Sequence, residues 1–254
     1  MNYQNLQAET SDGVATLRLN RPEVLNALNV PTALELVQAL EALRRDKSIK
    51  LLVVTGAGRA FCAGGDIGEM QASARRFFRV GLSSLHRAIA LLGHFPQPTI
   101  GAIRGPAVGA GMNLALACDL RIASDTLKFQ QAFVHVGLTP DCGGTYWLPR
   151  LVGSARAAEF VLTGRDVLAT EALSLGLVNQ VVPDAELDAV AMAAARKLAA
   201  LPRELLARQK RLLLAGQKNN LAVQLRAEKA AQFESARSAY AQASLQAFLA
   251  QRGR

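Results

Sequence analysis

Residues 51–66 read LLVVTGAGRAFCAGGD, and residues 99–119 read TIGAIRGPAVGAGMNLALACD. Each stretch is an apolar strand followed by a glycine-rich turn that leads into a predicted helix. Glycine lets a backbone approach a ligand closely, and the N–H groups at a helix start carry partial positive charge. Both turns are therefore predicted to bind a negatively charged group.

The dinucleotide-binding pattern GxGxxG is the competing interpretation of these turns. Phe61 and Leu114 stand where the third glycine of that pattern belongs. No suitable acidic residue follows about 20 positions later at the end of a second strand. A Rossmann-type dehydrogenase is therefore disfavoured.

Strand patterns alternate with helical patterns in the first two thirds of the chain. The apolar, β-rich runs predicted as strands are residues 14–19, 51–55, 99–103 and 120–123. Thr32 and Glu35 have the spacing of a capping box for a helix over residues 31–43, and Thr170 is expected to cap a short helix that Gly176 ends. This alternation predicts a layered α/β fold.

The composition after Pro183 is typical of continuous helix. The segment contains two valines and no isoleucine or threonine, whereas Ala, Leu, Arg, Lys and Gln dominate. Beyond Leu187, apolar residues fall on one helix face, which must cover a core or a partner subunit: Val190, Ala191, Ala194 and Leu198. We expect a core with the binding site over residues 1–183 and a helical oligomerisation region over residues 184–254.

The formal net charge of +9 raises the question of nucleic-acid binding. Residues 184–254 contain 12 Lys/Arg and 6 Asp/Glu, which leaves +6 there and +3 in the rest of the chain. No basic cluster is interleaved with base-stacking aromatic residues. The excess charge indicates solvated helix faces and attraction to an anionic ligand, so no nucleic-acid partner is expected.

Other features limit the location and chemistry of the protein. No apolar run approaches the ~18 to 20 residues of a membrane span, and the first residues lack the pattern of a secretory signal. Cys62, Cys118 and Cys142 have no CxxC spacing and cannot all pair, which favours a reducing cytoplasm. His86 and His94 have no Cys or carboxylate at ligand spacing, so no metal site is expected and both are interpreted as isolated surface residues.

Four stretches carry a family resemblance. They read NRPEVLNALN (20–29), GRAFCAGGDI (58–67), GPAVGAGMNLALACDLRIAS (105–124) and GLTPDCGGTYWLPRLVG (137–153). Their order and spacing resemble the successive signatures of the crotonase (enoyl-CoA hydratase/isomerase) superfamily over essentially the whole chain. The resemblance implies an α/β spiral of ββα units, with C-terminal helices that build a homotrimer or a hexamer.

The resemblance also implies an acyl-CoA thioester as the substrate, with coenzyme A as part of that substrate and no separate cofactor. Crotonases hold the thioester oxygen in an oxyanion hole, and matching positions assign its donors to the backbone N–H groups of Gly65 and Ala110. Losing one such donor typically costs ~10²- to 10³-fold in rate. The residues that would contact CoA are Pro22, Asn26, Ala27, Leu28, Ala63, Gly64, Asp66 and Ile67.

The expected base comes from the same resemblance. Asn113 and Phe133 stand where family hydratases carry two glutamates, and neither is a carboxylate, although both should line the substrate site. Asp141 matches the functional aspartate of several isomerases and of the dehalogenase, and PDCGGT followed by WLPR is closest to the phenylacetate-pathway ring-epoxide isomerase branch. Asp141 is the predicted catalytic base. Apolar neighbours expected to raise its pKa by desolvation are Phe133, Val134, Val136 and Leu138.

One carboxylate suffices for a 1,3-proton shift, whereas adding water across a double bond requires two groups. The sequence therefore predicts an acyl-CoA isomerase that shifts an enoyl double bond or isomerises a related ring. The alternatives are an enoyl-CoA hydratase that uses Asp141 alone and a non-catalytic relative that binds acyl-CoA or RNA. A cysteine hydrolase built from Cys142, His135 and Asp141 is disfavoured, because these residues are merely sequence neighbours.

Overall fold

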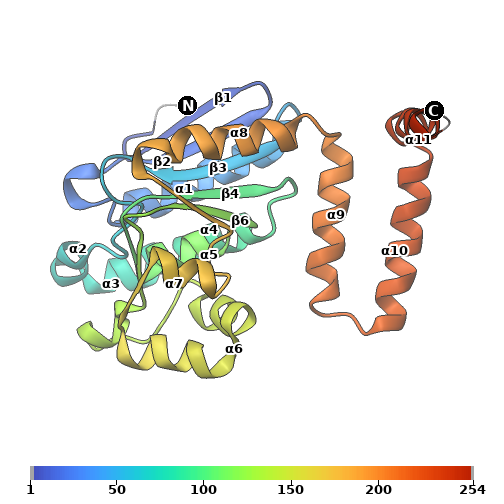
Figure 1. Cartoon of the computed structure of the whole chain (residues 1–254). Coiled ribbons are helices and arrows are strands. Elements are labelled where there is room, and N and C mark those ends of the chain that lie inside the picture. Colours follow the sequence, from blue (N-terminus) through green and yellow to red (C-terminus); the bar gives the residue numbers. More distant parts are fainter. Residues whose placement is uncertain (1–2, 253–254) are drawn as a thin grey trace. The chain divides into compact units, whose positions relative to one another are not determined.

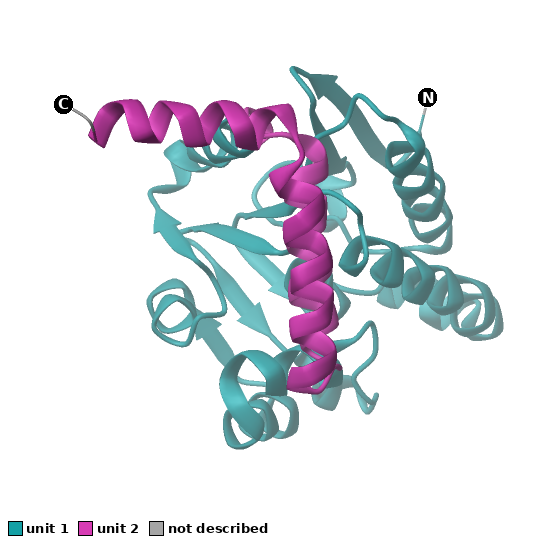
Figure 2. Ribbon diagram, turned by 90° about the vertical axis from the view of Figure 1, so that its right-hand side faces the viewer, with its two compact units in different colours: residues 1–198 teal, residues 199–254 magenta. Residues whose placement is uncertain are grey.

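The computed structural model describes residues 3–252 (Figure 1). The chain divides into two compact units between Leu198 and Ala199, drawn in different colours in Figure 2. The predicted role of residues 184–254 in oligomerisation remains a prediction. None of the helices within residues 3–252 has the length and hydrophobicity that a membrane span requires.

A six-stranded sheet forms the centre of the first unit. Its strands, in spatial order, are β1 (Leu6–Ser11), β2 (Val14–Leu19), β3 (Leu51–Gly56), β4 (Thr99–Ile103), β6 (Leu120–Ser124) and β9 (Gln180–Val182). β1 and β2 pair in antiparallel fashion and the other pairs are parallel. Every residue of β3 and β4 is buried, as expected for parallel strands that are covered on both faces. The four predicted strands are confirmed.

A smaller sheet explains the repeating topology. It contains β5 (Pro106–Val108), β7 (Lys128–Gln130) and β8 (Asp166–Leu168) in the order β5-β7-β8. The chain passes from β4 to β5 to helix α5 (Ala110–Leu116), and again from β6 to β7 to helix α6 (Gly144–Thr163). An isolated parallel bridge between Cys62 and Ala107 of β5 places the turn after β3 next to the small sheet. The predicted spiral of ββα units is confirmed.

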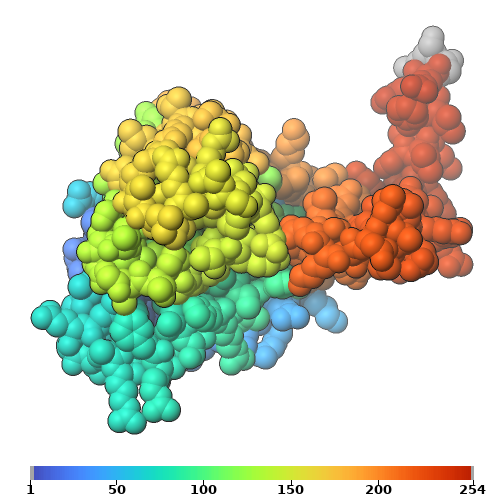
Figure 3. Space-filling model, turned by 90° about the horizontal axis from the view of Figure 1, so that it is seen from below, coloured from blue at the N-terminus to red at the C-terminus, as the bar shows by residue number. Residues whose placement is uncertain are grey.

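Helices pack on the sheets of the first unit. The longer ones besides α5 and α6 are α1 (Val30–Arg45), α4 (Leu82–Gly93) and α8 (Leu187–Ala199). The shorter ones are α2 (Ile67–Ala72), α3 (Ala74–Arg76), α7 (Ala169–Ser174), a π-helical turn (Phe77–Gly81) and 3₁₀ turns at Pro22–Val24, Ala132–Val136 and Asp184–Glu186. The teal surface that contains α2 and α3 projects from this unit (Figure 3).

Two predicted helix caps are wrong. Asn29 caps α1, because its Oδ1 accepts hydrogen bonds from the N–H and Oγ1 of Thr32 at 2.9 and 2.6 Å. Glu35 instead accepts from the backbone N–H groups at residues 4 and 5, which ties the start of the chain to α1. Thr170 lies inside α7, whose N-cap residue is Leu168.

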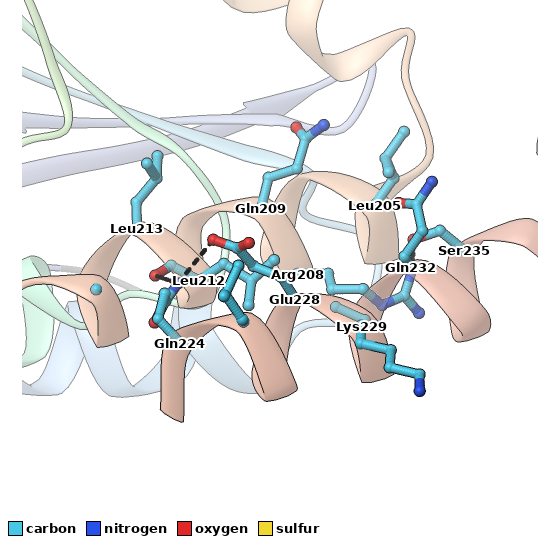
Figure 4. A pocket seen from close by; sticks show the side chains of 13 residues that line it. Leu205, Arg208, Gln209, Leu212, Leu213, Gln224, Glu228, Lys229, Gln232 and Ser235 are labelled. Atoms are coloured by element: carbon cyan, nitrogen blue, oxygen red, sulfur yellow. Dashed lines mark hydrogen bonds between the residues drawn. The ribbon is translucent and has the colours of Figure 1, made fainter. Parts of the chain in front are cut away.

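The second unit is helical, as predicted after Pro183. Its helices are α9 (Arg203–Gly216), α10 (Leu221–Ala236) and α11 (Ala239–Arg252). A groove of about 1120 Å³ lies between α9 and α10, and its lining includes Leu205, Leu212, Arg208 and Lys229 (Figure 4). Leu225 also lines it. The apolar side chains of these helices are thus partly open to the surface.

Candidate active site

The two glycine-rich turns lie against each other. Cys62 of the first turn bridges Ala107 of the second, and the Val108 N–H donates to the Cys62 carbonyl at 2.9 Å. A Cβ atom added to Gly64 would lie 2.8 Å from the Val108 oxygen and 3.8 Å from the Ala110 nitrogen. Only glycine permits this approach, which brings the two predicted oxyanion turns together.

Gly65 and Ala110 offer backbone donors at this junction. The backbone on either side of Gly65 is hydrogen-bonded, since the Leu28 N–H donates to the Gly64 carbonyl and the Asp66 N–H donates to the Leu28 carbonyl. Within residues 3–252 the Gly65 N–H donates no hydrogen bond. Ala110 is the first residue of α5, where N–H groups have no partner inside the helix. Two neighbouring N–H groups are therefore available for an anionic oxygen.

Asp141 lies in the loop that enters α6 and is half-buried. Its Oδ1 atom is buried and has no hydrogen-bond partner among residues 3–252. Burial raises the pKa of the Asp141 carboxyl, and the hydrogen bond from Cys142 only partly opposes this. A carboxyl with a raised pKa and one oxygen without a hydrogen-bond partner is suited to accept and return a proton.

Asn113 supports the Asp141 turn. Its side chain is fully buried, and its Nδ2 donates to the Asp141 carbonyl oxygen at 2.8 Å. Its Oδ1 accepts from Gln131 Nε2 at 2.7 Å. Both polar atoms of Asn113 therefore have protein partners, and the residue reaches the site through Asp141.

His86 does not stand alone on the helix surface, and that interpretation is wrong. It is exposed on α4, but its Nε2 accepts from the Cys142 N–H at 3.4 Å. Nothing local in the sequence links the two residues, because they are 56 positions apart. Trp147 packs beside the same loop, where a Cβ on Gly143 would lie 3.0 Å from the indole nitrogen.

The apolar surroundings of Asp141 differ in part from the prediction. Phe133 is buried, and its ring lies 3.5 Å from the place of a Cβ on Gly109. Val134 and Val136 are 43% and 53% exposed, so they exclude little water. Phe133 thus remains the apolar wall at the start of α5, next to Ala110.

The two motifs expected to hold CoA lie side by side. Gly65 bridges Leu28, and the Ala63 N–H donates to Leu25 at 2.9 Å. Leu28, Asn26 and Gly64 are buried, which leaves mainly their backbones for a ligand, whereas the more open positions are Pro22, Ala27, Ala63 and Ile67.

Asn26 and Asp66 hold these motifs in shape. The Asn26 amide donates to Ala57 and Ala60, and its Oδ1 accepts from the Arg21 N–H. Asp66 caps α2 and pairs with Arg21 at 2.9 Å. Burial alone would raise the pKa of Asp66, but the hydrogen bonds from Arg21 and the α2 backbone outweigh it and lower that pKa.

The thiols of Cys62 and Cys142 are buried in the loops of the candidate site. Burial raises the pKa of Cys62 to about 12 and also raises the pKa of Cys142, so both thiols stay protonated. His135 contacts the Gly164 carbonyl at 2.9 Å, which does not complete a cysteine triad. No group of three His, Cys, Asp or Glu suited to a metal ion occurs within residues 3–252.

Known proteins are similar to this chain in sequence and in fold. The family model described as enoyl-CoA hydratase/isomerase matches residues 9–253. A relative from Rhodobacter capsulatus named "Probable enoyl-CoA hydratase" is 40% identical over 252 residues, which are 99% of this chain and 97% of the relative. The 1,2-epoxyphenylacetyl-CoA isomerase of Escherichia coli is 42% identical over 201 residues, 75% of this chain and 74% of the relative. A structure described as an enoyl-CoA hydratase from Thermobifida fusca in complex with CoA has a TM-score of 0.84 at 36% identity, covering 91% of this chain and 92% of that chain.

Proposed function

Because this chain belongs to the enoyl-CoA hydratase/isomerase family, we propose that it is an acyl-CoA isomerase whose single base is Asp141. The substrate class is a β,γ-unsaturated acyl-CoA thioester, and a ring isomerisation of an acyl-CoA would use the same groups. Coenzyme A is the carrier part of the substrate, and the chemistry takes place on the acyl part.

The proposed reaction has two proton transfers. The Asp141 carboxylate removes a proton from Cα, and the electron pair moves onto the thioester oxygen as an enolate. The Gly65 and Ala110 N–H groups hold that oxygen where the charge develops. Asp141 then returns the proton at Cγ, the double bond moves between Cα and Cβ, and the carboxylate is regenerated.

The observation that carries this proposal is that the buried Oδ1 of Asp141 has no hydrogen-bond partner among residues 3–252. A carboxyl with both oxygens paired with protein donors would hold its charge and transfer protons poorly. The positions that resemble the two hydratase glutamates hold the Asn113 amide and the Phe133 ring, which cannot accept a proton. One acid that serves both transfers fits a 1,3-shift.

The test is the conversion of 3-hexenoyl-CoA to 2-hexenoyl-CoA, followed by the absorbance of the conjugated thioester. Asp141→Asn should reduce turnover by ~10²- to 10⁴-fold, the usual contribution of a positioned proton carrier. His94→Ala provides the control in the same assay, because His94 is the C-cap residue of α4. Undiminished turnover by Asp141→Asn would remove Asp141 as the base.

Hydration is the second candidate, because the Rhodobacter capsulatus relative named as a hydratase aligns over nearly the full length of both chains. Crotonyl-CoA separates the two reactions, since it can be hydrated but has no β,γ double bond to move. Accumulation of 3-hydroxybutyryl-CoA at a rate equal to or above that of hexenoyl isomerisation would favour the hydratase.

A further inference from the structure

The peptide bond between Asp141 and Cys142 is held at both of its polar atoms by side chains. Its carbonyl oxygen accepts from Asn113 Nδ2 at 2.8 Å, and its N–H donates to His86 Nε2 at 3.4 Å. Asn113 belongs to α5 and His86 to α4, so two separate helices contact one peptide group. The Gly144 N–H gives the same carbonyl a second donor at 3.0 Å.

This peptide precedes a strained backbone position. Cys142 has φ of +48°, in the left-handed region that non-glycine residues rarely occupy, and Gly143 continues with φ of +82°. Such a conformation persists only where the surrounding structure fixes it, and it is often found where a functional side chain must be aimed. The two side-chain contacts supply that constraint next to Asp141.

We propose that His86 and Asn113 are positioning residues that fix the Asp141–Cys142 peptide and thereby aim the Asp141 carboxylate. This inference rests on the proposed function, in which Asp141 is the base. In this role His86 acts as a hydrogen-bond acceptor and carries no proton of the reaction.

The amide at position 113 is suited to this task. Gln131 donates to Asn113 Oδ1 at 2.7 Å, which orients the amide so that Nδ2 faces Asp141. A carboxylate at position 113 would direct an acceptor at the Asp141 carbonyl. Gly144 leaves room for the amide, because a Cβ there would lie 2.6 Å from Nδ2.

The imidazole of His86 accepts the hydrogen bond from the Cys142 N–H through Nε2. Nε2 can accept from Cys142 only while it carries no proton, so Nδ1 bears the ring proton in this arrangement. Glutamine offers an acceptor oxygen at similar reach without a titratable group. His86→Gln should therefore keep the contact, and His86→Ala should remove it.

The experiment compares wild type, His86→Ala and His86→Gln in two measurements. The first is kcat and KM for 3-hexenoyl-CoA isomerisation, and the second is amide hydrogen exchange of the segment that contains Cys142. His94→Ala is the matched control, since His94 is an exposed histidine that directly follows the same helix, and its Nδ1 contacts the Ala90 carbonyl of its own turn. Thermal unfolding verifies that each variant is folded.

His86→Ala should lower kcat by roughly 10- to 100-fold, as a misplaced catalytic group does, with little change in KM and faster exchange at Cys142. His86→Gln should restore both values, and His94→Ala should change neither. Failure of glutamine to restore turnover would overturn the positioning role and indicate a proton carrier. Faster exchange with full turnover, or lost turnover with unchanged exchange, would also overturn it. Full turnover by Asp141→Asn would instead remove the proposed function, which separates the two failures.

Discussion

Replacing Asp141 by asparagine should stabilise the fold while it removes activity. The buried Oδ1 of Asp141 has no partner among residues 3–252, and burial raises the pKa of this carboxyl. At neutral pH the folded protein therefore holds a carboxyl whose charge is poorly solvated. A neutral amide of the same size avoids that cost.

The magnitude follows from the cost of an unpaired buried group. Such a group costs about 1–3 kcal/mol, and the partial exposure of Asp141 indicates the lower end, about 1 kcal/mol. For a protein of this size that corresponds to a rise in Tm of about 2–4 °C.

The sign of the pH dependence can be worked out. Because the folded pKa is raised, the folded protein keeps this proton at pH values where the unfolded chain has released it. The stability that the protonated group provides is full below the ordinary aspartate pKa and is lost as pH rises through the folded pKa. Asparagine does not titrate, so the advantage of the variant should grow with pH across that window and then level off.

Urea unfolding of wild type and Asp141→Asn between about pH 4.5 and pH 8 measures this difference. Asp119→Asn is the matched control, because the Asp119 carboxylate accepts from the Thr99 N–H and Oγ1 at 2.8 and 3.0 Å. That variant should lose stability. A destabilised Asp141→Asn, or a stability difference that does not change with pH, would refute the reasoning about burial.

Two further predictions concern the neighbouring turns. Gly111→Ala should destabilise the fold by about 1–3 kcal/mol, measured by thermal unfolding, because its Cβ would meet the Cys62 carbonyl and lie 2.7 Å from the Cys62 Cβ. Asp66→Asn should weaken folding at neutral pH, where the Arg21 partner favours the charged carboxyl. Since the folded pKa of Asp66 is lowered, the stability it provides is present above the ordinary aspartate pKa and should be lost as pH falls through the folded value, which urea unfolding at decreasing pH checks.

Four strands of the large sheet could be predicted from sequence, most clearly β3 and β4, whose residues are all buried between covering layers. The small sheet could not, since β5, β7 and β8 have three residues each and their periodicity is too short to detect. Strand β1 was missed although a signal exists, for Asp12 and Gly13 form a two-residue hairpin turn with positive φ at both positions. The α1 cap was misplaced because Asn29 and Thr32 are both good capping residues and only the structure shows which one accepts.

The site was predictable where it depends on local motifs. Glycine-rich turns after strands predicted a site for a negatively charged group, and the family resemblance assigned its donors to Gly65 and Ala110. The structure brings these two turns together. The contacts of His86 and Gln131 could not be predicted from the sequence, because each residue contacts a distant segment and no spacing rule describes such a pair. The exposure of Val134 and Val136 also depends on how a short 3₁₀ turn is oriented, which hydrophobicity alone does not determine.

Position 113 connects the choice of reaction with the architecture of the loop. A carboxylate there could serve as a second acid, but it would direct an acceptor at the Asp141 carbonyl, and Gln131 would no longer determine which atom faces the loop. The Asn113 amide cannot transfer a proton, but its Nδ2 donates a hydrogen bond to the Asp141 carbonyl. The absence of a carboxylate at position 113 and the fixed placement of the Asp141 peptide therefore depend on the same residue, as the proposed one-base proton shift requires.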